Sequence, residues 1–237
     1  MLLQCLASGD HDRSNSDIKS TVSPYLFLAV DLPPPPLFQD SHEKNIVPQV
    51  GIHSVLSKYD GITTQVSLIS NLFLDSHKSS CKESAGQLKR YKCQKLPQYI
   101  ILHFKRFTRN IFVEEKNPTI VNFPLRGLDF RDCKCINCFW NSFIMNVLDI
   151  DNPMDDTSYD LIANVTHESV AGTTRDKENT VWKVHLRAAG GGGDGEKWFM
   201  IQDLIVEETR KEMIFLGETV IQVSLCAVDL LINNQVS

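Results

Sequence analysis

The fold is decided by the stretch Leu96-Pro97-Gln98-Tyr99-Ile100-Ile101-Leu102-His103-Phe104-Lys105-Arg106-Phe107. It opens with a leucine-proline pair, continues as a nearly unbroken apolar run and closes with a Lys-Arg pair between two phenylalanines. A run of this length that is rich in isoleucine, leucine and aromatic residues predicts a strand buried on both faces. The rest of the chain shows what kind of sheet this strand joins.

Size and charge limit the classes of function. The chain has 237 residues, 42% of them hydrophobic, which suits one domain or one domain with a piece of another. A formal net charge of -5 argues against broad electrostatic binding of nucleic acid. We expect the local basic clusters to be solvated surface. They are Lys89, Arg90, Lys92 and Lys95, and then Lys105, Arg106 and Arg109.

The cysteines and the hydrophobic pattern indicate the cellular compartment in which the protein is expected. The amino terminus lacks the positive charge of a signal peptide, and no run approaches the length of about 18 apolar residues that a membrane helix needs. The cysteines are odd in number and irregularly spaced, so we expect reduced thiols in the cytosol or nucleus. They are Cys5, Cys81, Cys93, Cys133, Cys135, Cys138 and Cys226.

The periodicity predicts many strands and few helices. One apolar helix face is expected at Ile52, Val55, Leu56 and Tyr59, followed by a helix-ending glycine at Gly61. Further strands are expected at 25–31, 117–124, 159–165, 181–186, 198–203 and 218–223. This pattern favours an antiparallel sheet in an α+β domain.

The stretch at 96–107 resembles the central palm strand of the ubiquitin-specific proteases, which are cysteine proteases that cleave ubiquitin from proteins. Further blocks resemble the spliceosomal, tri-snRNP-associated branch of that family, the snRNP assembly-defective proteins. The resemblance covers about 25–64, 90–131 and 158–223. Its blocks, in chain order, are 25–28, 31–33, 46–50, 60–63, 95–97, 105–108, 115–124 and 159–164.

The resemblance implies a papain-like cysteine-protease fold, mainly its antiparallel palm and fingers, with the amino-terminal thumb missing. The branch implies this fold without protease activity, a role in pre-mRNA splicing, a nuclear location and spliceosomal tri-snRNP proteins as partners. It implies no cofactor, no direct contact with nucleic acid and no membrane association. Whether ubiquitin is a partner stays open.

The positions that match the family's catalytic motifs carry other residues. A cysteine protease needs a thiol of lowered pKa, an imidazole within about 3 Å of the sulfur and a group that orients the ring. In active members the thiol lies in a Gly-Asn-Thr-Cys-Tyr box, which Cys5 does not match and the other six cysteines do not match either. The histidine position of the Gly-His-Tyr motif falls on Val181, and Trp182 takes the tyrosine position. The first aspartate of the Phe-Asp-Asp motif falls on Gln202, and the second on Asp203.

Two other histidines are candidates for the role of the catalytic base. His185 shares a strand face with Val181, but four residues of strand separate them by about 13 Å, too far for proton transfer. His167 matches another family histidine, which is not the base. We expect both to be ordinary half-exposed strand histidines. Gln202 could orient an imidazole but would not stabilise its cation, and Asp203 is expected on the opposite face from Gln202.

These replacements predict a pseudo-deubiquitinase that acts as a non-catalytic scaffold. Two alternatives stay open: a fragment of an active cysteine-type deubiquitinase whose missing half lies upstream, and a module that binds ubiquitin without cleaving it. Zinc needs four ligands, usually as two close pairs. Cys135 and Cys138 form one such pair, whereas Cys81 and Cys93 are eleven residues apart. We therefore expect free thiols, with Cys135 and Cys138 as the remaining candidates for a metal site.

The family resemblance also divides the chain. Residues 1–24 are expected to be a disordered or wrongly assigned tail, and 25–223 a partial ubiquitin-specific-protease-like domain with irregular insertions at 65–88 and 132–157. Residues 224–237 are expected to be an atypical tail. Because the resemblance stops abruptly at these segments, our hypothesis is a transcript with retained intronic sequence and a missed beginning. Sequencing the full transcript tests it.

Overall fold

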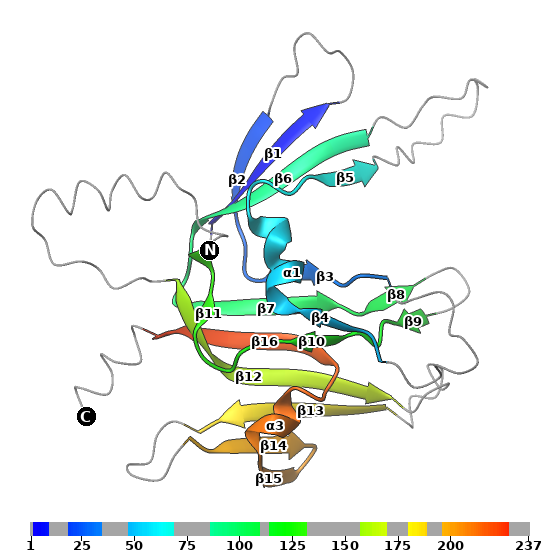
Figure 1. Ribbon diagram of the computed structural model, residues 1–237, viewed down its shortest axis with the longest axis vertical. Coiled ribbons are helices and arrows are strands. Elements are labelled where there is room, and N and C mark those ends of the chain that lie inside the picture. The colour runs from blue at the N-terminus through cyan, green and yellow to red at the C-terminus, as the bar shows by residue number, and fades with distance from the viewer. Residues whose placement is uncertain are drawn as a thin grey trace, which may run out of the picture. The chain divides into compact units, whose positions relative to one another are not determined.

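A computed structural model describes residues 2–9, 19–34, 47–68, 86–109, 114–131, 157–169, 180–188 and 196–227 (Figure 1). Strands dominate, as the sequence predicts. No helix in this part of the chain has the length and apolar character to cross a membrane. Two compact units divide the chain. The first comprises 1–25, 57–95 and 132–150, and the second comprises 26–56, 96–131 and 151–237.

The first unit is built on a four-stranded sheet of order β2-β1-β6-β5. These strands are β1 (Leu2–Gly9), β2 (Lys19–Pro24), β5 (Gln65–Leu68) and β6 (Gly86–Lys95). The 3-10 turn η1 (Ser57–Tyr59) belongs to the same unit. The sequence prediction of a disordered tail over 1–24 differs from this result, because β1 and β2 pair with each other and β1 also pairs with β6. The expected irregular insertion at 65–88 likewise begins and ends in strands, while its centre lies outside the described residues.

The second unit is built on an eight-stranded sheet whose main path runs β15-β14-β13-β12-β16-β7-β3, with β11 paired to β12. The path strands are β3 (Leu28–Asp31), β7 (Tyr99–Lys105), β12 (Ser158–Ser169), β13 (Thr180–Arg187), β14 (Trp198–Gln202), β15 (Ile205–Thr209) and β16 (Thr219–Cys226). The smaller strands are β4 (Gln49–Gly51), β8 (Phe107–Arg109), β9 (Glu114–Lys116), β10 (Ile120–Asn122) and β11 (Leu128–Asp129). Two short helices, α1 (Ile52–Leu56) and α3 (Lys211–Ile214), complete the unit.

The sheet is mixed rather than purely antiparallel. β3 pairs parallel with β7, and β4 pairs parallel with β10 in a separate two-stranded sheet. The pattern of hydrophobic residues does not indicate whether two paired strands run parallel or antiparallel, because their relative direction depends on how the chain connects them. β16 extends to Cys226, so the expected atypical tail over 224–237 begins inside a paired strand.

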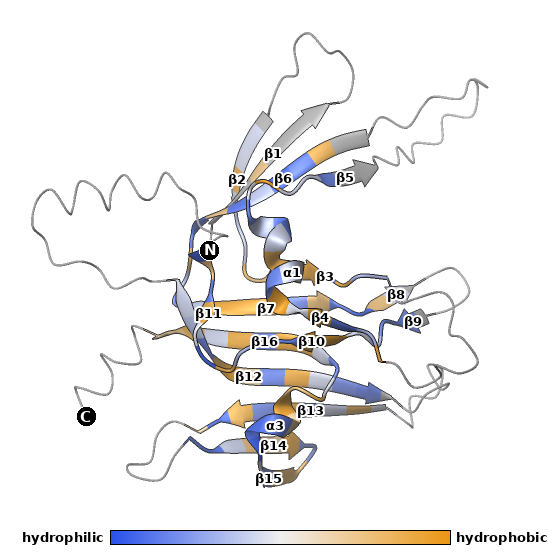
Figure 2. Ribbon diagram, in the orientation of Figure 1, coloured by the Kyte–Doolittle hydropathy of each residue, from blue (hydrophilic) through white to orange (hydrophobic). Residues whose placement is uncertain are grey.

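The strand that decides the fold, β7, is an interior strand between β16 and β3 (Figure 2). Ile100, Leu102 and Phe104 are buried on one face. On the other face Ile101 and His103 are only half-buried and Tyr99 is 50% exposed. The prediction of burial on both faces is therefore wrong for this structure, because no described layer fully covers the second face.

The predicted helix face is confirmed in part. Ile52, Val55 and Leu56 are buried on α1, and Tyr59 is buried in η1. The helix is only five residues long, since a 3-10 turn replaces its last part. Gly61 has a φ of 79° and donates its backbone N–H to the Tyr91 carbonyl at 2.9 Å, as expected of a glycine that ends a helical segment.

Candidate functional site

The candidate site is the part of β13 and β14 where the family resemblance places the catalytic histidine and aspartate. Val181 lies near the start of β13 and Gln202 is the last residue of β14. The ladder between these strands pairs Val184 with Ile201 and His185 with Met200. Strand alternation then puts Val181, His185 and Gln202 on the same face of the sheet. The two side chains at the positions that the resemblance assigns to the catalytic histidine and aspartate are an alkyl group and a neutral amide.

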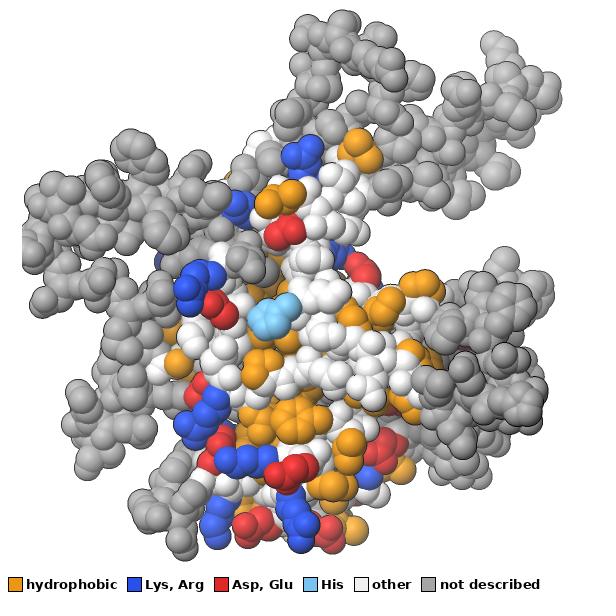
Figure 3. Space-filling model, in the orientation of Figure 1, with side chains coloured by type: hydrophobic (Ala, Val, Ile, Leu, Met, Phe, Trp, Pro, Cys, Tyr) orange, Lys and Arg blue, Asp and Glu red, His pale blue; other side chains and the backbone are white. Residues whose placement is uncertain are grey.

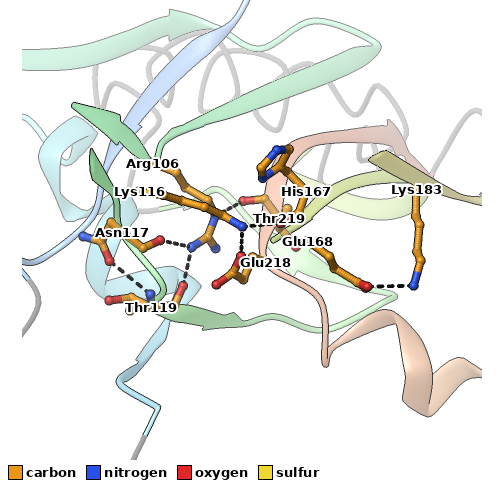
Figure 4. A network of polar contacts seen from close by, with 9 residues as sticks. All are labelled: Arg106, Lys116, Asn117, Thr119, His167, Glu168, Lys183, Glu218 and Thr219. Atoms are coloured by element: carbon orange, nitrogen blue, oxygen red, sulfur yellow. Dashed lines mark hydrogen bonds and ion pairs between the residues drawn. The ribbon is translucent and has the colours of Figure 1, made fainter. Parts of the chain in front are cut away.

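Val181 lies directly opposite Glu168 of β12. The carboxylate of Glu168 accepts a hydrogen bond from Lys183 Nζ at 2.7 Å, in a pair that is largely solvent-exposed (Figure 4). No group at position 181 can accept or donate a proton. Among the described residues, an ion pair lies beside the position at which the resemblance places the catalytic base.

His185 is buried within the sheet. Its ring is only 5% exposed, and it lies opposite Asn164 of β12 and Met200 of β14. Burial lowers the pKa of its imidazole, so the neutral form prevails at neutral pH. The expectation of a half-exposed histidine is wrong here. His185 lies four residues along the same strand from Val181, the position that the resemblance assigns to the base, and so about 13 Å away.

His167 lies on the other face of the sheet. It is directly opposite Trp182, and the two ring centroids are 4.6 Å apart. Phe107 packs edge-on against His167 at 5.1 Å. Burial, together with the nearby Lys116 charge, lowers the pKa of His167. His167 is 7% exposed, so it too is more buried than expected, and it is held by aromatic packing.

Asp203 does not continue β14. It lies in the two-residue turn before β15, is exposed, and has a φ of 52°. Aspartate tolerates this left-handed conformation better than most residues. The expectation that Asp203 lies on the strand and faces the opposite side from Gln202 is therefore wrong, because Asp203 lies in a turn. The one sequence signal for this turn was the aspartate itself, since Leu204 is not a typical turn residue.

A buried cation lies beside the aromatic group. Arg106 is fully buried, and its guanidinium donates to the backbone carbonyls of Thr219 at 2.5 Å, Asn117 at 2.9 Å and Thr119 at 2.6 Å (Figure 4). Burial lowers its pKa to about 10, which still leaves it charged at neutral pH. The prediction of a solvated basic cluster is therefore wrong for Arg106, although Lys105 is exposed and paired with Asp31. The flanking phenylalanines were the signal for burial.

A second buried cation completes this network. Lys116 forms an ion pair with Glu218 and donates to the backbone carbonyl of His167 at 2.6 Å. Because these partners come from β12 and the approach to β16, Arg106 and Lys116 tie the β8–β9 hairpin to the central sheet. The contacts of Arg106 Nε, Arg106 Nη1 and Lys116 all go to backbone carbonyls or to Glu218 of the same unit, which indicates a structural role.

Another charged cluster lies over β13–β15 and α3, where Figure 3 shows basic and acidic side chains side by side. Glu196 is its centre, within 3.3 Å of Arg126, 3.6 Å of Arg187 and 3.1 Å of Lys211. These cations outweigh its burial and lower the pKa of the Glu196 carboxyl. The pair with Lys211 links the first turn of α3 to the segment just before β14.

The thiols give no activated nucleophile among the described residues. Cys93 is fully buried, and burial raises its pKa to about 12. Cys226 is buried in β16, and Cys5 is half-buried in β1. Cys81, Cys133 and the pair Cys135 and Cys138 lie outside the described residues, so the predicted state of that pair stays a prediction. No cluster of three metal-ligating side chains occurs in the described part of the chain.

Comparison with known proteins decides the family. The model of the family "Ubiquitin carboxyl-terminal hydrolase" matches residues 26–225. The chain belongs to this family. That result confirms the fold class predicted from 96–107 and the other blocks.

Two curated relatives match most of the chain, and one of them carries a splicing name. The chain is 38% identical over 208 residues to "Probable mRNA-splicing protein ubp10" of Schizosaccharomyces pombe, which covers 86% of this chain and 34% of the relative. It is 35% identical over 211 residues to human "Ubiquitin carboxyl-terminal hydrolase 39", which covers 88% of this chain and 31% of the relative. The chain thus spans about a third of the length of these curated relatives.

A solved structure shows the same fold. The crystal structure described as that of an essential yeast splicing factor superimposes with a TM-score of 0.55 at 23% identity. The match covers 94% of this chain and 41% of the other. At this identity the likeness extends to the fold and no further.

Proposed function

We propose that the chain is a non-catalytic member of the ubiquitin carboxyl-terminal hydrolase family that serves as a scaffold in pre-mRNA splicing, in the assembly of the tri-snRNP and spliceosome. The observation that carries the non-catalytic part is that Val181, at the position that the resemblance assigns to the family's histidine, has no titratable group. Gln202 supports it, because a neutral amide cannot stabilise an imidazolium. The splicing part is supported by the name of one relative, "Probable mRNA-splicing protein ubp10", which is 38% identical to this chain over 208 residues.

A scaffold needs its fold but none of the catalytic groups. The buried network of Arg106 and Lys116 maintains the sheet without involving Val181 or Gln202. Spliceosomal tri-snRNP proteins are the proposed partners, and the nucleus is the proposed location. The palm strands would then supply rigid surface for protein contacts instead of a reaction centre.

Affinity purification from nuclear extract tests the splicing role. The tagged chain is expected to recover tri-snRNP proteins, identified by mass spectrometry, and Cys5→Ser is expected to recover the same set. Tagged Arg106→Ala, which should disturb the fold, serves as the negative control. Recovery of no splicing proteins by the unaltered chain would contradict the proposal.

A ubiquitin suicide probe tests the non-catalytic part separately. No covalent adduct is expected with the chain, whereas an active ubiquitin-specific protease in a parallel tube should be labelled. An adduct would favour the alternative of a cysteine-type deubiquitinase. Titration of isotope-labelled ubiquitin, followed by its amide resonances, decides the other alternative of a non-cleaving ubiquitin-binding module.

A further inference from the structure

β15 is the last strand at one end of the eight-stranded sheet. Among the described residues, it pairs with β14 and with no other strand (Figure 1). Ile205 is 56% and Val206 62% exposed, and Leu204 in the preceding turn is 98% exposed. At the other edge of the same path, Leu28 and Val30 of β3 are buried. An exposed apolar edge strand is a template on which another strand can pair.

The register of the β14–β15 hairpin shows which backbone groups face outward. Gln202 and Ile205 form the pair that closes the two-residue turn, and Met200 pairs with Glu207. In an antiparallel ladder, hydrogen-bonded and non-hydrogen-bonded pairs alternate. Ile205 and Glu207 therefore direct their N–H and C=O groups toward β14, while Val206 and Glu208 direct theirs away from the sheet. One added strand could take up both outward pairs.

On each face of β15 an apolar side chain is followed by a glutamate. Ile205 precedes Glu207 on one face, and Val206 precedes Glu208 on the other. Asp203 adds a third exposed carboxylate at the turn, and Lys197 lies 3.8 Å from Glu208 in an exposed pair of little strength. The complement of this pattern is a strand with β-branched residues beside Ile205 and Val206 and with lysine or arginine beside the two glutamates.

The same pattern disfavours a second copy of the chain. An antiparallel pairing of two β15 strands that used all the outward backbone groups would place Val206 opposite Glu208 of the other copy. Glu207 would then lie directly opposite its own counterpart, and like charges in that position destabilise the pair. Charge complementarity therefore selects a basic strand over self-association.

We propose that β15 is a docking edge that binds an extended, basic and β-branched segment of a partner protein as an additional antiparallel strand of the sheet. The backbone of Val206 and Glu208 provides the hydrogen bonds, and the two glutamates provide the selectivity for a basic segment. This interaction does not require catalysis or ubiquitin.

A peptide titration tests the proposal. The probe is a capped, fluorescein-labelled octapeptide with the central sequence Lys-Lys-Val-Ile between threonines, titrated with the full 237-residue chain and followed by fluorescence anisotropy. Hydrogen exchange at the Val206 and Glu208 amides is measured with and without the peptide. Saturable binding with slowed exchange at both amides is expected. Binding of equal affinity by a peptide with Glu-Glu in place of Lys-Lys would overturn the proposal.

Two variants separate strand pairing from charge attraction. Val206→Pro removes only an outward N–H, which an edge strand tolerates, and should weaken binding about tenfold while the urea midpoint stays within error. Glu207→Lys should weaken binding by a similar factor and is paired with Glu212→Lys, the same charge change on exposed α3, which should have little effect. If Val206→Pro is poorly folded, the Glu207→Lys and Glu212→Lys pair decides. Equal loss in both charge variants, or a concentration-dependent dimer through β15 by sedimentation, would overturn the proposal.

Discussion

Val181 lies directly opposite Glu168 in the ladder between β12 and β13, and the Glu168 carboxylate bonds Lys183 on the same face. An alkyl side chain therefore occupies the position at which the family resemblance places the catalytic imidazole. The lysine beside it would also oppose the positive charge that a base acquires when it takes a proton. Val181 itself cannot titrate, which is the basis of the proposal that this member of the family is non-catalytic.

Restoring the two family residues should not restore hydrolysis. The double substitution Val181→His with Gln202→Asp supplies a base and its orienting acid, but cleavage also needs a reactive thiol within about 3 Å of the imidazole. We expect release of fluorophore from a ubiquitin–aminomethylcoumarin substrate to stay at the rate of the buffer blank. Turnover above that of a matched Val181→Ala and Gln202→Ala variant would show that a nucleophile is in place.

Arg106 should be among the most sensitive positions of the second unit. Arg106→Ala leaves three backbone carbonyls without their donor, at about 1–3 kcal/mol for each buried group. Since a domain is stable by only about 5–15 kcal/mol, we expect loss of cooperative unfolding or a large drop in the urea midpoint. Arg106→Lys should recover only part of the stability, because a point cation cannot bridge all three carbonyls.

The matched control for Arg106 is Arg126→Ala. Arg126 is 62% exposed and pairs with Glu196 at 3.3 Å, an interaction worth about 1 kcal/mol or less. The urea midpoint of Arg126→Ala should therefore shift little from that of the unaltered chain. Equal shifts for Arg106→Ala and Arg126→Ala would contradict the account of a buried carbonyl clamp.

His185 should make the fold sensitive to acid. Its folded pKa lies below the unfolded value of about 6.5, so the unfolded chain binds more protons in the window below that pH. Stability is full above pH 6.5 and falls as the pH drops toward and through the folded pKa. His167, whose pKa is also lowered, contributes with the same sign.

Urea unfolding between pH 7.5 and pH 5 measures this dependence. The slope of the free energy of unfolding against pH is at most about 1.4 kcal/mol per pH unit for each proton. His185→Gln should reduce the slope, whereas His53→Gln, at an exposed position on α1, should leave it unchanged. An unchanged slope in His185→Gln would show that another group governs the acid sensitivity.

Cys93 should resist alkylation in the native state. The thiolate is the reactive form, and both the absence of solvent exposure and a pKa of about 12 disfavour it at pH 8. Mass spectrometry after brief treatment with iodoacetamide should find Cys93 unmodified in buffer and modified in 6 M urea. The half-buried Cys5 provides the internal comparison. Native labelling of Cys93 as fast as that of Cys5 would contradict the burial.

Local sequence patterns predicted strand positions well where a change between polar and apolar residues, or a proline, marks the end of a strand. β10 lies between Pro118 and Pro124 as expected, and β13 differs from its predicted range by one residue at each end. The strands of the first unit were missed because their hydrophobic signal is short and weak. β1, for example, is stabilised by pairing with a strand about 85 residues away in the chain.

The sequence by itself determined the family and the central strand, because these depend on local composition and motif order. The tertiary structure decided what the stretch 96–107 does. In the tertiary structure Arg106 is buried against carbonyls from distant segments, one face of β7 is only half-buried, and β15 lies at an exposed edge of the sheet. Burial, strand direction and edge position depend on contacts between residues far apart in the chain, and no local pattern encodes them.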